Sequence, residues 1–147
     1  MRNPVLRFVE AIAMKTQYLG PASAKSGDQG ELLAYFYLRE LGFTVVARQW
    51  RTSRLRGEID LIAWEGNTLC FVEVKTRTAR GLVGAESAVD EQKEKMLKRV
   101  AAAYLRQLPM RPGGVPAADT ICTRFDVISV YLDSLPEGIE LIRNAFA

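Results

Sequence analysis

Two neighbouring apolar segments each carry a pair of ionisable residues, Glu58 and Asp60 in the first and Glu73 and Lys75 in the second. Both segments are rich in β-branched and aromatic residues, and the Gly-Asn pair at 66–67 between them predicts a β-hairpin with a two-residue turn. In that register Asp60 lies opposite Glu73, Glu58 lies opposite Lys75, and all four side chains share one face. Directly opposed carboxylates repel each other. We therefore expect a divalent cation between Asp60 and Glu73.

A simpler interpretation is that these acids decorate a solvated sheet face. The same face of the predicted hairpin, however, also carries Ile62, Trp64, Leu69 and Phe71, so it is not a plain polar surface. Charged groups are seldom placed among apolar side chains without a partner or a function. We therefore interpret the ionisable residues of the hairpin as a functional site.

Histidine is absent from the 147 residues, which excludes Ser-His and Cys-His nucleophile pairs and every zinc site that uses histidine. Any chemistry must therefore use carboxylates, lysine or a metal held by oxygen ligands. Cys70 and Cys122 form no spaced cluster, so we expect both to be reduced in a cytoplasmic protein. No apolar run approaches the ~20 residues of a membrane span, so we expect no membrane partner.

The net charge of +3 is unevenly distributed along the chain. Residues 1–56 carry nine bases and four acids, residues 57–74 carry four acids and no base, and residues 75–111 again carry nine bases and four acids. An acidic hairpin between two basic stretches suits a metal site that acts on a phosphate backbone, because the acids hold the cation and the bases attract the polyanion. Either basic stretch could instead be a solvated face.

The first helix of the main domain is predicted over residues 26–41, where a capping-box pattern precedes a stripe formed by Ala34, Leu38 and Leu41. Glu31 falls on the same stripe, which packing alone does not explain. The carboxylate could simply favour the positive N-terminus of the helix. It could also reach the acids of the hairpin, and we expect this second arrangement.

The first strand is predicted over residues 43–47, and an arginine-rich loop with Arg51, Arg54 and Arg56 follows it. Arginines that bind phosphates beside an aromatic ring that stacks on bases are typical of nucleic-acid binding. Trp50 could provide that ring, or it could pack against the core of the domain.

The second helix is predicted to start at residues 87–90 and to end near the proline at 109. Its apolar stripe is formed by Val89, Leu97, Val100 and Tyr104. Lys93 lies on this stripe, where its aliphatic stem could snorkel to solvent. Alternatively, Lys93 could direct a cation at a phosphate beside the hairpin acids. Arg77, at the end of the hairpin, is a further candidate for a phosphate contact.

The predicted order is helix, strand, hairpin, helix and a strand over 124–131, with a last short strand over 139–143. This order is typical of an α/β fold with a central mixed β-sheet flanked by helices, in which the strand after the crossover helix runs parallel to one hairpin strand. Residues 26–147 form the predicted domain. Residues 1–25 predict an amphipathic helix and a linker, and this helix could pack on the domain, pair with a second copy in a homodimer, or contact another partner.

Asp60, followed after twelve residues by Glu73-Val74-Lys75, resembles the metal-binding signature of the PD-(D/E)XK nuclease superfamily. Longer blocks resemble the YraN family, which are small bacterial proteins classed as candidate endonucleases and similar in core to archaeal Holliday-junction resolvases. The blocks are residues 30–31, 57–63, 71–77 and 124–127. The likeness covers about residues 26–131. The chain departs from the family at Gln49, where the family often has Asn, and in an unusually long loop over 109–118.

The resemblance implies a restriction-endonuclease-like three-layer core and a metal-dependent endonuclease that hydrolyses phosphodiester bonds in DNA, with branched DNA among the candidate substrates. It implies that Asp60, Glu73 and the carbonyl of Val74 hold Mg²⁺ or Mn²⁺, with Glu31 joining directly or through water. Lys75 would orient the attacking water or stabilise charge on the scissile phosphate. The alternative is a non-catalytic nucleic-acid-binding module that retains the nuclease fold. The enzyme is favoured because the chain retains the four residues Glu31, Asp60, Glu73 and Lys75.

Overall fold

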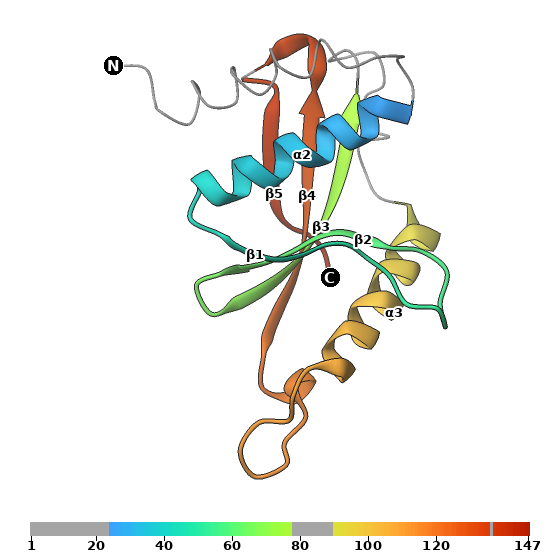
Figure 1. Ribbon diagram of the computed structural model, residues 1–147, viewed down its shortest axis with the longest axis vertical. Coiled ribbons are helices and arrows are strands. Elements are labelled where there is room, and N and C mark those ends of the chain that lie inside the picture. Colours follow the sequence, from blue (N-terminus) through green and yellow to red (C-terminus); the bar gives the residue numbers. More distant parts are fainter. Residues whose placement is uncertain (1–23, 78–89, 136) are drawn as a thin grey trace.

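The computed structural model describes residues 24–77, 90–135 and 137–147 as one central sheet with a helix on each face (Figure 1). The elements are α2 (Ala24–Glu40), β1 (Thr44–Trp50), β2 (Ile59–Glu65), β3 (Thr68–Arg77), α3 (Glu91–Gln107), β4 (Cys122–Tyr131) and β5 (Ile139–Phe146), with short 3₁₀ turns at Ala117–Asp119 and Leu132–Ser134. The strands lie in the order β1-β2-β3-β4-β5. The α/β fold predicted from the sequence is confirmed.

Strand directions follow from the connections. The short β2–β3 turn makes these strands antiparallel, whereas β4 returns after α3 and runs parallel to β3. The outer strands β1 and β5 are each antiparallel to their neighbours. The predicted parallel pairing of the strand after the crossover helix with a hairpin strand is therefore confirmed.

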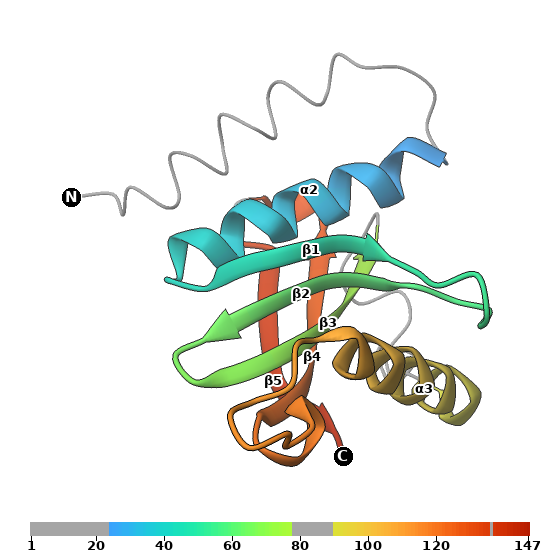
Figure 2. The ribbon, with the colours of Figure 1, turned by 60° about the horizontal axis from the view of Figure 1, so that its bottom comes forward.

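Two apolar clusters fill the space between the sheet and its helices, and Figure 2 shows α2 and α3 on opposite sides of the sheet. The α2 side buries Leu33 and Leu38 of the helix against Leu61 and Val72 of the hairpin. The α3 side buries Leu97, Val100, Ala101 and Tyr104 of the helix against Ile62, Leu69 and Phe71. From Leu61 to Val72, successive residues of β2 and β3 thus alternate between the two clusters, as the period of a strand requires.

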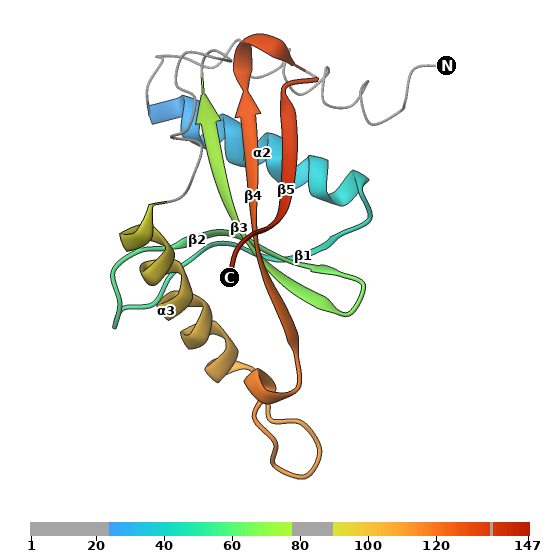
Figure 3. The ribbon, with the colours of Figure 1, turned by 180° about the vertical axis from the view of Figure 1, so that it is seen from behind.

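The predicted hairpin register is confirmed from Glu65, opposite Thr68, to Leu61, opposite Val72. Beyond that last pair the two strands follow different partners. The chain before Leu61 continues along β1, with Ile59 opposite Trp50, while β3 continues along β4 to the pair of Arg77 with Tyr131. Figure 3 shows the result, with β1 and β2 crossing the upright strands β3, β4 and β5. The sheet therefore opens between β2 and β3 at one end.

The ends of α2 and β1 differ from the prediction. Helix α2 ends at Glu40, where Gly42 has a φ of 92° and the N–H of Phe43 bonds to the carbonyl of Leu38, so Leu41 leaves the stripe and is 44 % exposed. Leu33, which the predicted stripe did not include, is fully buried in the core. Strand β1 continues to Trp50 instead of ending at 47, because an edge strand can expose arginines while it pairs on one side.

Several predictions fall on residues that the structure does not describe. They are the N-terminal helix and linker up to residue 23 and most of the loop after the hairpin, including the predicted start of the second helix. None of the helices among the described residues is long and apolar enough to cross a membrane.

Candidate metal centre

Asp60 lies where the sheet opens, one residue beyond the last backbone pair of the hairpin. Its Oδ2 accepts a hydrogen bond of 2.8 Å from the backbone N–H of Val74. The side chain of Asp60 thus takes the place of the backbone carbonyl that would accept this N–H in a regular β-sheet. The alternation of β2 also breaks here, because Ile59 and Ile62 both pack on the α3 side while Leu61 packs on the α2 side. Asp60 therefore does not face Glu73 across a regular ladder, as the sequence predicted, but reaches into the gap between the strands.

Three carboxylates converge on this gap. Oxygen atoms of Glu31, Glu58 and Asp60 lie within 4.8 Å of one another, although the residues come from α2, the β1–β2 loop and β2. The predicted approach of Glu31 to the hairpin acids is thus what the structure shows. Gly30 makes the approach possible, because a Cβ at this position would lie 1.7 Å from the Oγ1 of Thr76 on β3.

Two polar side chains hold the outer acids in place. Gln49 donates a hydrogen bond of 2.8 Å from Nε2 to Oε2 of Glu31. Gln49 has a φ of 48°, a left-handed conformation that asparagine adopts more readily than glutamine. Arg51 forms an ion pair with Glu58. Arg51 is also one of the arginines predicted to bind phosphates, and this ion pair gives it a second role beside the acids.

Glu73 faces the other helix. Its Oε1 lies 2.9 Å from Nζ of Lys93, which stands in the first turn of α3. Asp90 caps that turn by accepting a 2.8 Å hydrogen bond from the backbone N–H of Lys93. The cap therefore fixes the backbone position from which the Lys93 side chain extends. The second oxygen of Glu73, Oε2, is buried without a hydrogen-bond partner within the part of the chain that the structure describes.

The electrostatics of the gap disfavour a full set of negative charges. Burial and the neighbouring charge of Glu73 raise the pKa of Asp60 well above its usual range, and Glu31 adds to this effect. Burial lowers the pKa of Lys75, and the nearby charge of Arg77 lowers it further. For Lys93 burial acts downward, but the hydrogen bond and charge of Glu73 outweigh it and raise the pKa.

These residues fit a hard divalent cation. Mg²⁺ and Mn²⁺ prefer oxygen ligands, and carboxylates are the usual protein donors for them. Asp60 and Glu73 are only 8 % and 7 % exposed, so water alone offsets little of their charge. The buried Oε2 of Glu73 without a hydrogen-bond partner is the kind of atom that a bound cation would satisfy.

A family model described as "Uncharacterised protein family UPF0102" matches residues 30–130, which include every acid of the gap. The chain belongs to the UPF0102 family. The similarity to the YraN family expected from the sequence motifs is thereby confirmed.

Individual UPF0102 relatives match most of the chain. A UPF0102 protein of Koribacter versatilis is 47 % identical over 126 residues, which cover 86 % of this chain and 82 % of that protein. A UPF0102 protein of Solibacter usitatus is 45 % identical over 120 residues, covering 82 % and 84 %. A third, from Caldicellulosiruptor saccharolyticus, is 37 % identical over 122 residues, covering 82 % and 95 %.

The UPF0102 block at 124–127 lies on β4, where Val127 pairs with Glu73, and its Arg124 and Asp126 stabilise the sheet. Arg124 donates from Nε and Nη2 to the fully buried carboxylate of Asp126, at 2.7 and 2.8 Å, and also pairs with Glu65 beside the hairpin turn. Arg143 of β5 binds the same Glu65, and the backbone N–H of Asn144 donates to Asp126. Sequence reasoning missed this network, because its members come from three separate strands.

The remaining predicted residues of this UPF0102 chain lie around the gap. Arg54 and Arg56 are exposed on the loop between β1 and β2, and Arg77 is half-buried at the end of β3. Trp50 is partly buried and packs against the core, with its ring edge-on to that of Tyr104 and the centroids 5.2 Å apart. This is the packing alternative that the sequence left open for it.

Proposed function

We propose that the chain is a Mg²⁺- or Mn²⁺-dependent endonuclease that hydrolyses phosphodiester bonds in DNA. The observation that carries this proposal is the gap in the sheet, where three converging carboxylates stand beside the buried oxygen of Glu73 that lacks a hydrogen-bond partner among the described residues. Acids that repel one another in a buried place destabilise the fold unless a ligand offsets them. A divalent cation would offset their charges, and the surrounding arginines and lysines would attract a polyanionic substrate.

Asp60, Glu73 and the carbonyl of Val74 would hold the ion, with Glu31 joining directly or through water. When bound, a divalent ion supplies Lewis-acid polarisation of a phosphoryl oxygen and a lowered pKa for the attacking water. Lys75 lies two residues after Glu73 on β3, and its lowered pKa leaves it better able to exchange a proton than an ordinary lysine. We assign to Lys75 the orientation of the attacking water or the stabilisation of charge on the scissile phosphate.

Lys93 would contact the substrate beside this site. It binds the carboxylate of Glu73, and its side chain is 43 % exposed, so it can also turn outward. If Glu73 held the ion, the ammonium group of Lys93 would be available to a phosphate of the substrate.

Cleavage of labelled DNA tests the proposal. Wild type should cut in Mg²⁺ or Mn²⁺ and not in chelator, with duplex, single-stranded, flap and four-way DNA assayed side by side. Glu73→Gln and Lys75→Ala should each abolish cleavage while DNA binding persists. Glu140→Gln, an exposed acid on β5, is the matched control and should cut as wild type does.

Two results would contradict the proposal. Cleavage that survives in Glu73→Gln, with contaminating nuclease excluded, would remove the assigned site. DNA binding by wild type without any metal-dependent cleavage would favour the alternative, a nucleic-acid-binding module that retains the nuclease fold.

A further inference from the structure

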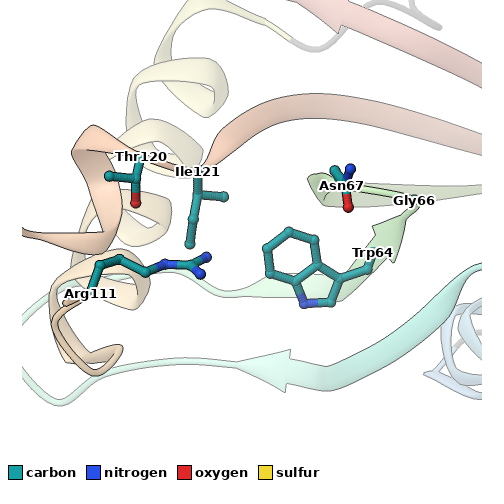
Figure 4. Close-up of a pocket in the computed structure, with 6 residues that line it drawn as sticks. All are labelled: Trp64, Gly66, Asn67, Arg111, Thr120 and Ile121. Atoms are coloured by element: carbon teal, nitrogen blue, oxygen red, sulfur yellow. The ribbon is translucent and has the colours of Figure 1, made fainter.

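A pocket of about 510 Å³ lies at the opposite end of the hairpin from the metal centre. Its walls come from the hairpin turn and from the segment between α3 and β4 (Figure 4). The lining residues are Trp64, Gly66, Asn67, Arg111, Thr120 and Ile121. Between Thr68, beside the turn, and Glu73 the strand β3 covers roughly 17 Å, at about 3.3 Å per residue. The pocket is therefore separate from the acids of the metal centre.

We propose that this pocket binds an unpaired nucleobase of DNA, so that the preferred substrate is a duplex with a single-stranded arm. This proposal rests on the proposed nuclease function and names the class of substrate for it.

Trp64 supplies the stacking surface. Its ring points into the pocket, with Ile121 and the guanidinium of Arg111 across from it (Figure 4). Trp64 is half-buried on the α3 side of the sheet, so neighbouring core residues hold the ring in place while part of it stays accessible. Every base has a π-face, and unpaired bases bind to proteins by stacking on such rings and on guanidinium planes.

The polar groups of the pocket match the edge of a base and its phosphate. Asn67 is exposed at the turn and offers an amide that can both donate and accept a hydrogen bond, as base edges require. Arg111 is exposed and offers a planar cation for a phosphate or a base. Glu65, the acid next to the turn, is already bound by Arg124 and Arg143. It therefore adds little repulsion toward a nucleic acid.

The loop that carries Arg111 has a defined shape. The N–H of Arg111 bonds to the carbonyl of Val115 at 2.9 Å, and the N–H of Gly114 bonds back to Arg111 at 3.1 Å. Gly113 and Gly114 have φ angles of 84° and 73°, which only glycine adopts without strain. A loop held in this way loses little freedom when a ligand binds. Met110 beside it is 69 % exposed, and apolar side chains of this kind separate base steps in other DNA complexes.

Helix α3 connects the two places. It begins at the metal centre, where Lys93 binds Glu73, and ends before the segment that forms the pocket wall. Its exposed side carries Lys95, Arg99 and Arg106 at helical spacing. These cations would contact phosphates between a base held in the pocket and a phosphate held at the metal centre.

Equilibrium binding in chelator tests the pocket independently of catalysis. We would compare a blunt duplex of about 20 base pairs with the same duplex carrying an arm of about five thymidines, by fluorescence anisotropy. Wild type should prefer the duplex with the arm. Trp64→Ala should weaken binding of the armed duplex about tenfold and leave blunt-duplex binding unchanged, while Trp64→Phe should keep most of the preference.

Three further variants protect the test against misfolding. Arg111→Ala alters an exposed side chain and should also reduce the preference for the arm, whereas Arg106→Ala, an exposed arginine outside the pocket, should weaken both ligands alike. The chain contains two tryptophans, so in Trp50→Phe the fluorescence reports on Trp64 alone and should be quenched by oligothymidylate.

Equal binding of both DNAs by wild type, or an unchanged preference in Trp64→Ala and Arg111→Ala, would overturn the pocket assignment. Absence of quenching in Trp50→Phe at saturating oligothymidylate would do the same. None of these results concerns metal-dependent cleavage, which the Glu73→Gln assay decides separately. If wild type preferred the duplex with the arm but showed no metal-dependent cleavage, only the nuclease function would be contradicted.

Discussion

Nζ of Lys93 lies 2.9 Å from Oε1 of Glu73, so an ammonium group on α3 binds the one carboxylate of β3, which is buried. A lysine at this place does part of what a cation would do, because it offsets one negative charge in the gap between β2 and β3. It contacts only one of the two oxygens, and Oε2 stays buried without a hydrogen-bond partner among the described residues. The pair therefore satisfies the carboxylate of Glu73 only in part.

Replacing this lysine should make the fold more dependent on metal. Lys93→Met keeps the aliphatic stem and removes the charge, so in chelator the free energy of unfolding should fall by about 1–3 kcal/mol, the scale of leaving a buried polar group unsatisfied. The stabilisation by added Mn²⁺ should increase, because metal binding no longer competes with the ammonium group. Thermal melts in chelator and in Mn²⁺ measure both effects.

Lys98→Met, an exposed position on the same helix, is the control and should change neither quantity. A Lys93→Met protein with the stability and the metal response of wild type would mean that the ion pair is a solvated contact without consequence for the site.

Local pattern was sufficient to predict much of this architecture. The Gly-Asn turn and the alternating residues of the hairpin predicted the register from Glu65 to Leu61, because pairing next to a tight turn has few alternatives. Glu31 was correctly placed near the acids, because its spacing put it on the inward face of a helix that must cover the sheet.

The opening of the sheet could not be predicted in this way. It arises because β2 follows β1 while β3 follows β4, and those partners are separated along the sequence. The same reason explains the missed ion pairs of Lys93 with Glu73 and of Arg124 with Glu65, since each joins segments whose relative position only the assembled fold determines. Leu41 was misplaced because the helix ends one residue earlier than its apolar stripe.

Gly30 should be essential for the position of Glu31. In Gly30→Ala the added methyl group would overlap Thr76, so α2 or β3 must shift, which should destabilise the protein by about 1–3 kcal/mol. Because Glu31 follows Gly30 directly, the stabilisation by added Mn²⁺ should also decrease. Melts in chelator and in Mn²⁺ provide both values.

Gly27 offers a matched control in the same helix. A Cβ at Gly27 meets nothing within 4 Å, so Gly27→Ala should stabilise the protein by about 0.4–1 kcal/mol through the unfolded state. Equal effects of the two substitutions would show that close packing at Gly30 does not position α2.

Arg54 should contact DNA phosphates. It is exposed on the loop between β1 and β2, three residues after Arg51, which forms an ion pair with Glu58. Arg54→Ala should weaken binding alike for all DNA sequences and reduce the slope of log Kd against log salt by about 1. Arg39→Ala, at the far end of α2, should leave the slope unchanged. An unaltered slope in Arg54→Ala would make this arginine part of a solvated surface.

The ion pairs beside the hairpin turn should make stability fall in acid. Hydrogen bonds from Arg143, and then from Arg124, lower the pKa of Glu65 to about 2. Because the folded pKa is depressed, the stabilisation is present above the ordinary glutamate pKa of about 4.3 and is lost as pH falls toward 2. Glu65→Gln should therefore cost about 1 kcal/mol at pH 7 and flatten this part of the pH profile.

Denaturant unfolding at several pH values measures that profile. Glu137→Gln, an exposed acid in the turn before β5, should retain the acid dependence of wild type. A Glu65→Gln protein that still loses stability between pH 4.5 and pH 2 as wild type does would assign the effect to other carboxylates.

Asp60→Asn should stabilise the metal-free protein and remove its response to metal. An asparagine Oδ1 can still accept the N–H of Val74, while the charge that Glu73 and Glu31 repel is gone. The gain should reach about 1 kcal/mol near neutral pH, the scale of an unfavourable pair across strands. The gain should grow as pH rises from 5 to 8. The pKa of Asp60 is raised in the folded protein, so over this range the carboxyl group ionises more readily in the unfolded chain. Wild type therefore loses stability as pH rises, whereas the variant does not. Added Mg²⁺ or Mn²⁺ should stabilise the variant far less than wild type.

Melts of both proteins across this pH range, with chelator and with metal, separate the two effects. A variant that is less stable in chelator and equally stabilised by metal would make Asp60 a structural acid, and the ion would then have to be held by Glu31, Glu58 and Glu73.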